Sequence, residues 1–179
     1  MNPQAIIDKY YLPNSNVWKV LVEHSMAVAN KAVSIAKNHP ELSADSTFIY
    51  EAAMLHDIGI YMTDAHDLFC FGSFPYISHG YLGRDLLDKE GFPIHALVCE
   101  RHTGTGLSIA DIETQNLPIP HRSMLPVSIE EQIICFADKF YSKSGQLDKA
   151  KSIDKIRKSL NKHGAEQLMR FDAWCEMFL

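Results

Sequence analysis

Histidine and aspartate residues, whose side chains bind metal ions, recur along the chain among small or apolar neighbours. They are His24, the His56-Asp57 pair, His79, His102 and Asp138. Burying such groups costs free energy unless they are hydrogen-bonded or coordinate a metal. A lone buried histidine or aspartate is typical of a hydrogen-bonded core residue, and it is the adjacent His56-Asp57 pair that favours a metal site. Their mixed nitrogen and oxygen donors suit iron, manganese, cobalt or zinc better than magnesium alone.

The His56-Asp57 pair carries the strongest signal of the set. It ends the segment EAAMLHDIG, in which Gly59 predicts the end of a helix. Two adjacent coordinating groups at that place can converge on one ion as the last turn unwinds. The four cysteines are widely spaced and form no C-x-x-C pair, which argues against a structural zinc site and a redox dithiol.

Apolar residues recur at helical spacing in the segments that carry these histidines and aspartates. The expected helices cover residues 3–11, 17–38, 45–59, 79–90, 93–101, 108–115, 128–141, 153–162 and 165–178. No alternating strand pattern competes, so we predict an all-α fold. The aromatic segment 61–78 reads as a long loop of the kind that forms lids, and the proline-rich segment 117–126 as a connector.

Composition sets the broad class. A chain of 179 residues, 46% hydrophobic and 22% charged, predicts one globular domain over residues 1–179. The net charge of -5 argues against a duplex nucleic acid partner. No segment resembles a secretory signal or a membrane span, and the unpaired cysteines suit a reducing compartment, so we expect a cytoplasmic protein without a membrane partner.

The order His, His-Asp, His, His, Asp resembles the signature of the HD-domain metal-dependent phosphohydrolases, in particular the members that bind two metals. The segments HGYLGRDLLDKEGFP, ERHTGTGLS and PVSIEEQIICFADKFYS are similar to small HD proteins of bacteria and archaea. The resemblance runs from about His24 to Tyr141, with a signature core of about 17–142. It implies a helical bundle with the metal site in its core, and it leaves the helices of 153–178 outside.

The resemblance also implies a ligand set. One metal would be held by His24, His56, Asp57 and Asp138, and a second by His79 and His102 with Asp57 as the bridge. Iron or manganese is favoured, with zinc, cobalt or nickel as alternatives. Two such ions can generate a hydroxide and neutralise a leaving oxygen. The expected reaction is hydrolysis of a phosphate ester or anhydride in a small substrate, with nucleotides among the candidates.

Basic residues beside the proposed ligands are candidate phosphate contacts. Arg101 and Lys139 are proposed as catalytic together with Asp57, and Arg84 and Thr103 as substrate-binding. A surface charge or ion pair is the alternative for the basic residues, and a structural turn for the segment 103–106. His66 is a candidate site or lid residue, with a hydrated loop histidine as the alternative. Phe69, Phe71, Phe74 and Tyr76 are a candidate wall for a flat substrate group, with anchoring of the loop to the core as the alternative.

Two departures from the family pattern bear on the substrate. Ile60 stands where many two-metal HD proteins carry a basic residue, and Thr103 stands where those that open cyclic di-GMP carry a histidine. That activity is therefore discounted, whereas the ligand order is similar to hydrolases of diadenosine tetraphosphate. An HD-type di-iron oxygenase is the competing hypothesis. A catalytically silent domain is a third, although it predicts loss of ligands and all six are present.

Overall fold

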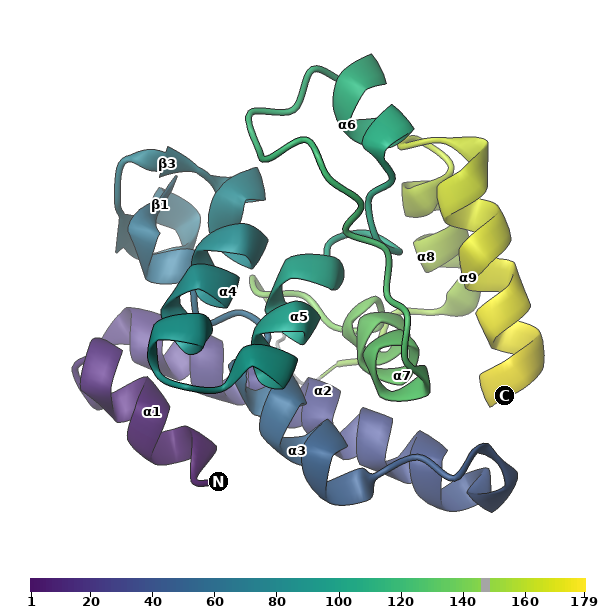
Figure 1. Ribbon diagram of the computed structural model, residues 1–179, viewed down its shortest axis with the longest axis horizontal. Coiled ribbons are helices and arrows are strands. Elements are labelled where there is room, and N and C mark those ends of the chain that lie inside the picture. Colours follow the sequence, from purple (N-terminus) through teal and green to yellow (C-terminus); the bar gives the residue numbers. More distant parts are fainter. Residues whose placement is uncertain (146–148) are drawn as a thin grey trace.

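The computed structural model describes residues 1–145 and 149–179, and its architecture is helical. Figure 1 shows the order of the elements along the chain. The α-helices are α1 (Pro3–Tyr10), α2 (Asn16–Asn38), α3 (Ser46–Leu55), α4 (His79–Lys89), α5 (Pro93–Arg101), α6 (Ile109–Thr114), α7 (Ile129–Asp138), α8 (Ile153–Leu160) and α9 (Ala165–Phe178). The predicted all-α class is confirmed, and α3 ends at Leu55 rather than near Gly59.

Short polar side chains start most of these helices. Ser15, Asp45, Ser128 and Ser152 each accept a hydrogen bond from a free backbone N–H of the first turn. At α6, Ser108 and Asp111 form the reciprocal capping box that the sequence predicts. These caps fix the residue at which each helix begins. They thereby help to determine which side chains of the helix face the core.

The core forms where α2, α3, α5 and α7 pack together, with α4 lying along α5. The buried residues on these helices are mainly aliphatic, and Leu21, Leu55, Ile133 and Phe136 are almost inaccessible to solvent. Burial of each such side chain contributes about 1.5–3 kcal/mol. This packing holds the helix ends that carry the histidines and aspartates in a fixed arrangement.

The segment between α3 and α4 contains short strands that the sequence analysis missed. β1 (Thr63–Ala65) pairs antiparallel with β2 (Cys70–Phe71) and parallel with β3 (Phe74–Pro75). The sheet order is β2-β1-β3. Strands of two or three residues are too short to show an alternating pattern, so the prediction of a plain loop over 61–78 was wrong.

The helix α9 packs against α7, and α8 packs against α9, on the side of the molecule opposite the small sheet (Figure 1). Phe171 and Phe178 of α9 contact Phe136 of α7, with ring centroids 5.3 and 5.4 Å apart. Aromatic pairs in this range are attractive beyond their buried area. The α9 helix is therefore joined to the core that carries the site.

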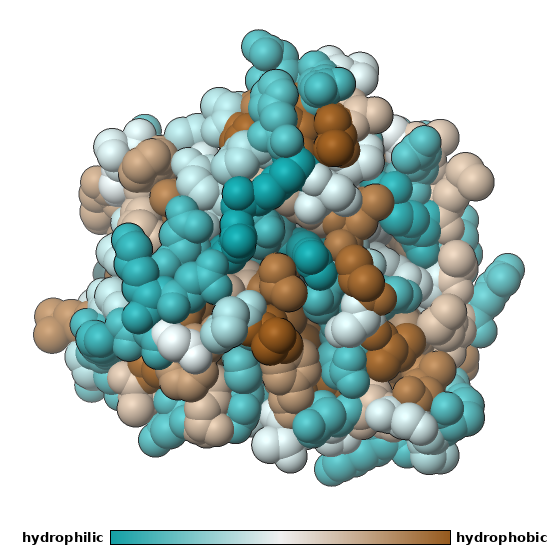
Figure 2. Space-filling model, in the orientation of Figure 1, coloured by the Kyte–Doolittle hydropathy of each residue, from teal (hydrophilic) through white to brown (hydrophobic). Residues whose placement is uncertain are grey.

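The surface mixes hydrophobic and hydrophilic residues. On the face drawn in Figure 2, hydrophobic residues form small groups separated by hydrophilic ones. Within residues 1–145 and 149–179, no helix is both long and apolar enough to cross a membrane.

Candidate metal centre

Six buried histidine and aspartate side chains meet in the interior, at five different helices. They are His24 in α2, His56 and Asp57 just after α3, His79 at the start of α4, His102 just after α5, and Asp138 at the end of α7. None of them exposes more than 7% of its surface. The fold thus brings together residues as distant in sequence as His24 and Asp138, which are 114 positions apart.

One side of the cluster consists of two imidazoles and two carboxylate oxygens. His24 Nε2 lies 3.0 Å from Asp138 Oδ1 and 3.3 Å from Asp57 Oδ2. His56 Nε2 lies 3.2 Å from Asp57 Oδ2 and 3.6 Å from Asp138 Oδ1. Four donor atoms therefore surround one point, as a site for a divalent ion requires.

The other side uses the second oxygen of Asp57. His79 Nε2 lies 3.4 Å and His102 Nε2 lies 3.2 Å from Asp57 Oδ1. The two Nε2 atoms are 3.1 Å apart. The two oxygens of one carboxylate thus face two different pairs of imidazoles, which is the placement that a bridging ligand needs.

Three of the histidines are held by the same local contact. The Nδ1 atoms of His56, His79 and His102 bond the carbonyl oxygens three residues earlier, at 2.6, 2.6 and 2.8 Å. A carbonyl oxygen only accepts, so each Nδ1 carries a proton, and in the neutral form of the ring Nε2 keeps the lone pair that can bind a metal. Such contacts orient metal-binding histidines. His24 differs, because its Nδ1 has no partner among the described residues.

Burial and charge act differently on the two sides of the cluster. Burial lowers the pKa of His79 to about 3, and also lowers that of His102. At His56 burial has the same effect, but the carboxylates of Asp57 and Asp138 outweigh it and raise the pKa to about 9. Although burial opposes ionisation of Asp57, the charges of His56 and Lys143 hold its pKa well below the usual range. The carboxylate is therefore ionised at neutral pH.

Several polar atoms of the cluster lack hydrogen bonds despite their close neighbours. Among the described residues, His56 Nε2 and both oxygens of Asp57 have no partner with suitable geometry. Buried polar groups are normally satisfied, and unsatisfied ones are costly. The donor set of imidazole nitrogens and carboxylate oxygens fits a divalent transition metal, which would satisfy these atoms.

The comparison with known families agrees with this geometry. The family model for the HD domain matches residues 21–142, which contain all six side chains. The chain belongs to the HD domain family. The resemblance inferred from the histidine and aspartate order is thereby confirmed at the family level.

Similar HD-domain chains carry different names. The chain is 30% identical over 146 residues to "Uncharacterized protein MJ0778" of Methanocaldococcus jannaschii, covering 80% of this chain and 79% of that protein. It is 29% identical over 151 residues to a tRNA (cytidine(56)-2'-O)-methyltransferase of Thermoplasma volcanium, covering 84% of this chain. The corresponding enzyme of Picrophilus torridus is 28% identical over 155 residues, or 86% of this chain. The match spans only 40% of the length of each methyltransferase. No solved structure matches the chain.

Lys143 contacts the cluster of six ligand candidates, hereafter the metal centre, and the sequence analysis missed it. Its Nζ lies 2.8 Å from Asp57 Oδ2, and its side chain is 16% exposed. Burial opposes its charge, but Asp57 outweighs that effect and raises the lysine pKa well above its usual value. The sequence showed only a lysine five positions after Asp138. It lies in an irregular segment, where helical periodicity does not predict which way a side chain points.

Lys139 lies at the same edge of the centre. Its Nζ is 2.8 Å from Asp138 Oδ2 and donates to the carbonyl oxygen of His102 at 3.3 Å. Although adjacent residues of a helix point in different directions, the Lys139 side chain still reaches the cluster. Lys139 is therefore placed where a catalytic cation could contact an anionic substrate.

The two arginines proposed as phosphate contacts are engaged elsewhere. Arg101 donates to both oxygens of the buried Glu131 at 3.0 Å, and Arg84 lies 3.4 Å from Glu100. Glu100 also accepts from Arg122 at 2.7 Å. These ion pairs join α5 to α7, α4 to α5, and α5 to the loop that holds Arg122, so the geometry favours a structural role over the predicted catalytic and substrate-binding ones.

The turn after His102 is tied to the C-terminal helix α9. Thr105 N donates to Gln167 Oε1 at 2.7 Å, and Gln167 Nε2 donates to the Gly106 carbonyl at 2.6 Å. Gly104 and Gly106 have positive φ values of 62° and 85°. The segment 103–106 is thus a braced structural turn, and substrate binding by Thr103 stays a prediction.

The segment 61–78 contributes Tyr76 to the centre, whereas His66 stands outside it. The ring of Tyr76 stacks on His79 with centroids 4.6 Å apart. His66 is exposed and pairs with Asp64 at 3.1 Å. Phe71 is 72% exposed, which leaves an aromatic surface on the small sheet but no contact with the ligands.

Proposed function

We propose that this HD-domain protein is a metal-dependent phosphohydrolase that cleaves an ester or anhydride bond of a small phosphorylated substrate. The observation that carries the proposal is the position of Asp57, whose two oxygens face different pairs of histidines at 3.2–3.4 Å. Such a carboxylate suits a centre of two divalent ions, with iron or manganese favoured. His24, His56 and Asp138 would complete one side, and His79 and His102 the other.

Two divalent ions held there would supply Lewis acidity and lower the pKa of a coordinated water. Phosphoester hydrolysis also requires that the negative charge of the phosphate be neutralised. Lysine side chains of this protein can do so. Lys139 and Lys143 both reach the carboxylate edge of the centre, each with Nζ 2.8 Å from a carboxylate oxygen. We assign them the role of binding phosphate oxygens and stabilising the charge that grows on them during bond cleavage.

The names of the methyltransferase relatives widen the range of substrates to be tested. Those enzymes act on tRNA according to their names, and this chain corresponds to 40% of their length. We therefore include tRNA beside free nucleotides and dinucleoside polyphosphates. The net charge of -5 still favours a small phosphorylated substrate over duplex nucleic acid.

The test is metal analysis of protein purified without chelator, followed by phosphate-release assays in air and under anaerobic conditions. We expect about two metals per chain and phosphate release that does not need oxygen. Oxygen consumption with two irons and no hydrolysis would instead support the di-iron oxygenase. Metal binding without turnover of any compound would support a silent domain.

A further inference from the structure

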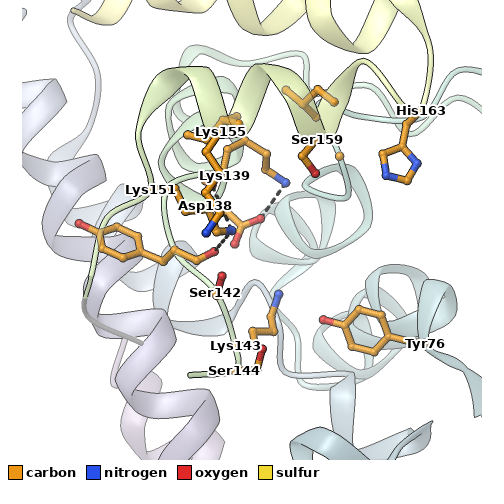
Figure 3. A pocket seen from close by; sticks show the side chains of 14 residues that line it. Tyr76, Asp138, Lys139, Ser142, Lys143, Ser144, Lys151, Lys155, Ser159 and His163 are labelled. Carbon is orange, nitrogen blue, oxygen red and sulfur yellow. Dashed lines mark hydrogen bonds and ion pairs between the residues drawn. The ribbon is translucent and has the colours of Figure 1, made fainter. Parts of the chain in front are cut away.

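A cavity of about 420 Å³ opens beside the metal centre and is lined by positive side chains. The end of α7, the following segment and the helix α8 surround it (Figure 3). Four lysines line it, namely Lys139, Lys143, Lys151 and Lys155. Asp138 reaches the same cavity, so the cavity is continuous with the proposed catalytic centre.

Among the residues that the structure describes, the positive charges that line this cavity outnumber the negative ones. Asp138 is the one carboxylate among the lining residues that the structure describes, and Lys139 already pairs with it. Lys151 donates to the backbone carbonyls of Lys139 and Tyr141, at 3.4 and 2.8 Å. Over residues 1–145 and 149–179, neither Lys151 nor Lys155 forms an ion pair. An anion bound here would relieve the mutual repulsion of these ammonium groups.

The pKa of Lys151 reflects this crowding. Burial lowers it, the charge of Asp138 opposes that effect, and the nearby charges of Lys139, Lys143 and Lys155 lower it further. Ser142, Ser159 and His163 also line the cavity and add further hydrogen-bonding side chains. Ammonium and hydroxyl groups converging on one space are the donors that bind phosphate oxygens in proteins.

We propose that this cavity binds a second phosphate group of the substrate, while the phosphate to be cleaved lies at the metal centre. The inference rests on the proposed hydrolase function and narrows its substrate class to compounds with at least two phosphates. Lys139 and Lys143 lie between the metal centre and the cavity, because both contact carboxylates of the centre and both line the cavity. Lys155 and Ser159 stand on the far wall, on α8.

The position of α8 in the chain agrees with a role in substrate choice. Lys151, Lys155 and Ser159 all follow residue 142, where the HD family match ends. The ligands of the centre therefore come from the shared family region, whereas this wall of the cavity comes from the chain's own C-terminal part. The cavity volume lies within the roughly 300–1,000 Å³ usual for small-molecule sites, which is ample for more than one phosphate.

Binding of imidodiphosphate, a non-hydrolysable analogue of pyrophosphate, tests the proposal on the full, metal-loaded chain. Calorimetry would compare it with orthophosphate for the wild type, Lys155→Ala and Lys155→Glu. Lys155 is exposed, so its replacement leaves the fold intact. We expect the affinity for imidodiphosphate to fall about fivefold in Lys155→Ala and at least about tenfold in Lys155→Glu, as the loss of a charge-assisted contact predicts. Orthophosphate affinity should change less than about twofold.

The matched control is Lys158→Ala, which removes an exposed lysine of α8 that does not line the cavity. It should bind both anions as the wild type does. Unchanged imidodiphosphate affinity in both Lys155 variants would overturn the inference, and so would an equal loss for the two anions. Phosphate release from esters, assayed on the same preparations, reports on the hydrolase function separately, because the binding measurement requires no turnover.

Discussion

Asp57 is the residue on which the two halves of the centre depend. Its side chain is completely buried, and its two oxygens contact the Nε2 atoms of His24 and His56 on one side and of His79 and His102 on the other. No other carboxylate of the described chain reaches both pairs. Loss of this residue should therefore affect both proposed ions together.

Replacement of Asp57 by alanine should abolish loading with two metals while the helices persist. The helical packing depends on residues such as Leu55 and Phe136, which do not involve the carboxylate. Metal content measured by mass spectrometry and helix content measured by circular dichroism would check this. Asp64→Ala, which removes an exposed carboxylate of β1, is the control and should keep its metal. Full metal content and activity in Asp57→Ala would contradict the site proposed here.

Lys143 supplies the second prediction at the residue scale. Its ammonium is the cation held 2.8 Å from Asp57, so Lys143→Gln should lower kcat/KM about 10- to 100-fold, by loss of charge stabilisation. The metal content should be unchanged. Lys149→Gln, an exposed lysine of the same stretch of chain, serves as the control. Wild-type kinetics in Lys143→Gln would remove this lysine from the mechanism.

At the scale of elements, a close approach of the HD turn to α4 positions the ligands. A Cβ atom on Gly59 would lie 2.2 Å from the His79 carbonyl oxygen and 2.6 Å from Gly83 N. Both obstacles are backbone atoms, which cannot move without shifting α4. Only glycine fits at this place. Its close contact with α4 fixes the position of that helix, and His79 is the first residue of α4.

Gly59→Ala should therefore lower the free energy of unfolding by about 2–3 kcal/mol, as overpacking of a core does. Metal affinity should fall as well, since the displaced backbone carries His79. Urea unfolding and metal titration would measure the two effects. Gly91→Ala is the comparison, because a Cβ there meets no atom within 4 Å and the φ of 85° alone costs about 1 kcal/mol. Equal losses in both variants would contradict the packing argument.

The helix α9 stabilises the turn that follows His102 through the buried side chain of Gln167. Gln167→Ala leaves the Thr105 N–H without its acceptor and removes one of two donors to the Gly106 carbonyl, which still accepts from Arg170, so we expect a loss of about 1–3 kcal/mol in unfolding free energy. Glu166→Ala changes an exposed neighbour on the same helix and should leave stability unchanged. Thermal and urea unfolding of the two variants would decide whether α9 braces the centre.

At the scale of the whole molecule, bound metals would act as cross-links among five helices. A ligand that binds only the folded state at 100 times its Kd adds about 2.7 kcal/mol of stability. For a chain of this size that corresponds to a rise in Tm of about 5–10 °C. We expect manganese or iron to raise the Tm of chelator-treated protein by this amount, with reversal on renewed chelation. A Tm that does not respond to metals would argue for hydrogen-bonded core histidines.

The amino-acid sequence alone determined the helices and the set of ligand candidates. Apolar spacing and caps such as Asp45 and Ser108 are local features, so they predict helices without knowledge of the fold. His56 and Asp57 are recognisable because two polar groups in an apolar stretch require a compensating partner. The order of the six residues was sufficient to infer the HD family, which the family comparison confirms.

Tertiary structure alone decided which charges face the centre. Arg101 and Lys139 each adjoin a proposed ligand in sequence, yet Arg101 pairs with Glu131 and Lys139 reaches Asp138. The small sheet of 63–75 and the lysine-lined cavity were likewise invisible, because both depend on contacts between segments that carry no periodic pattern. Periodicity reports how a residue lies within its own helix, whereas the direction of a long charged side chain depends on partners that only the folded chain brings near.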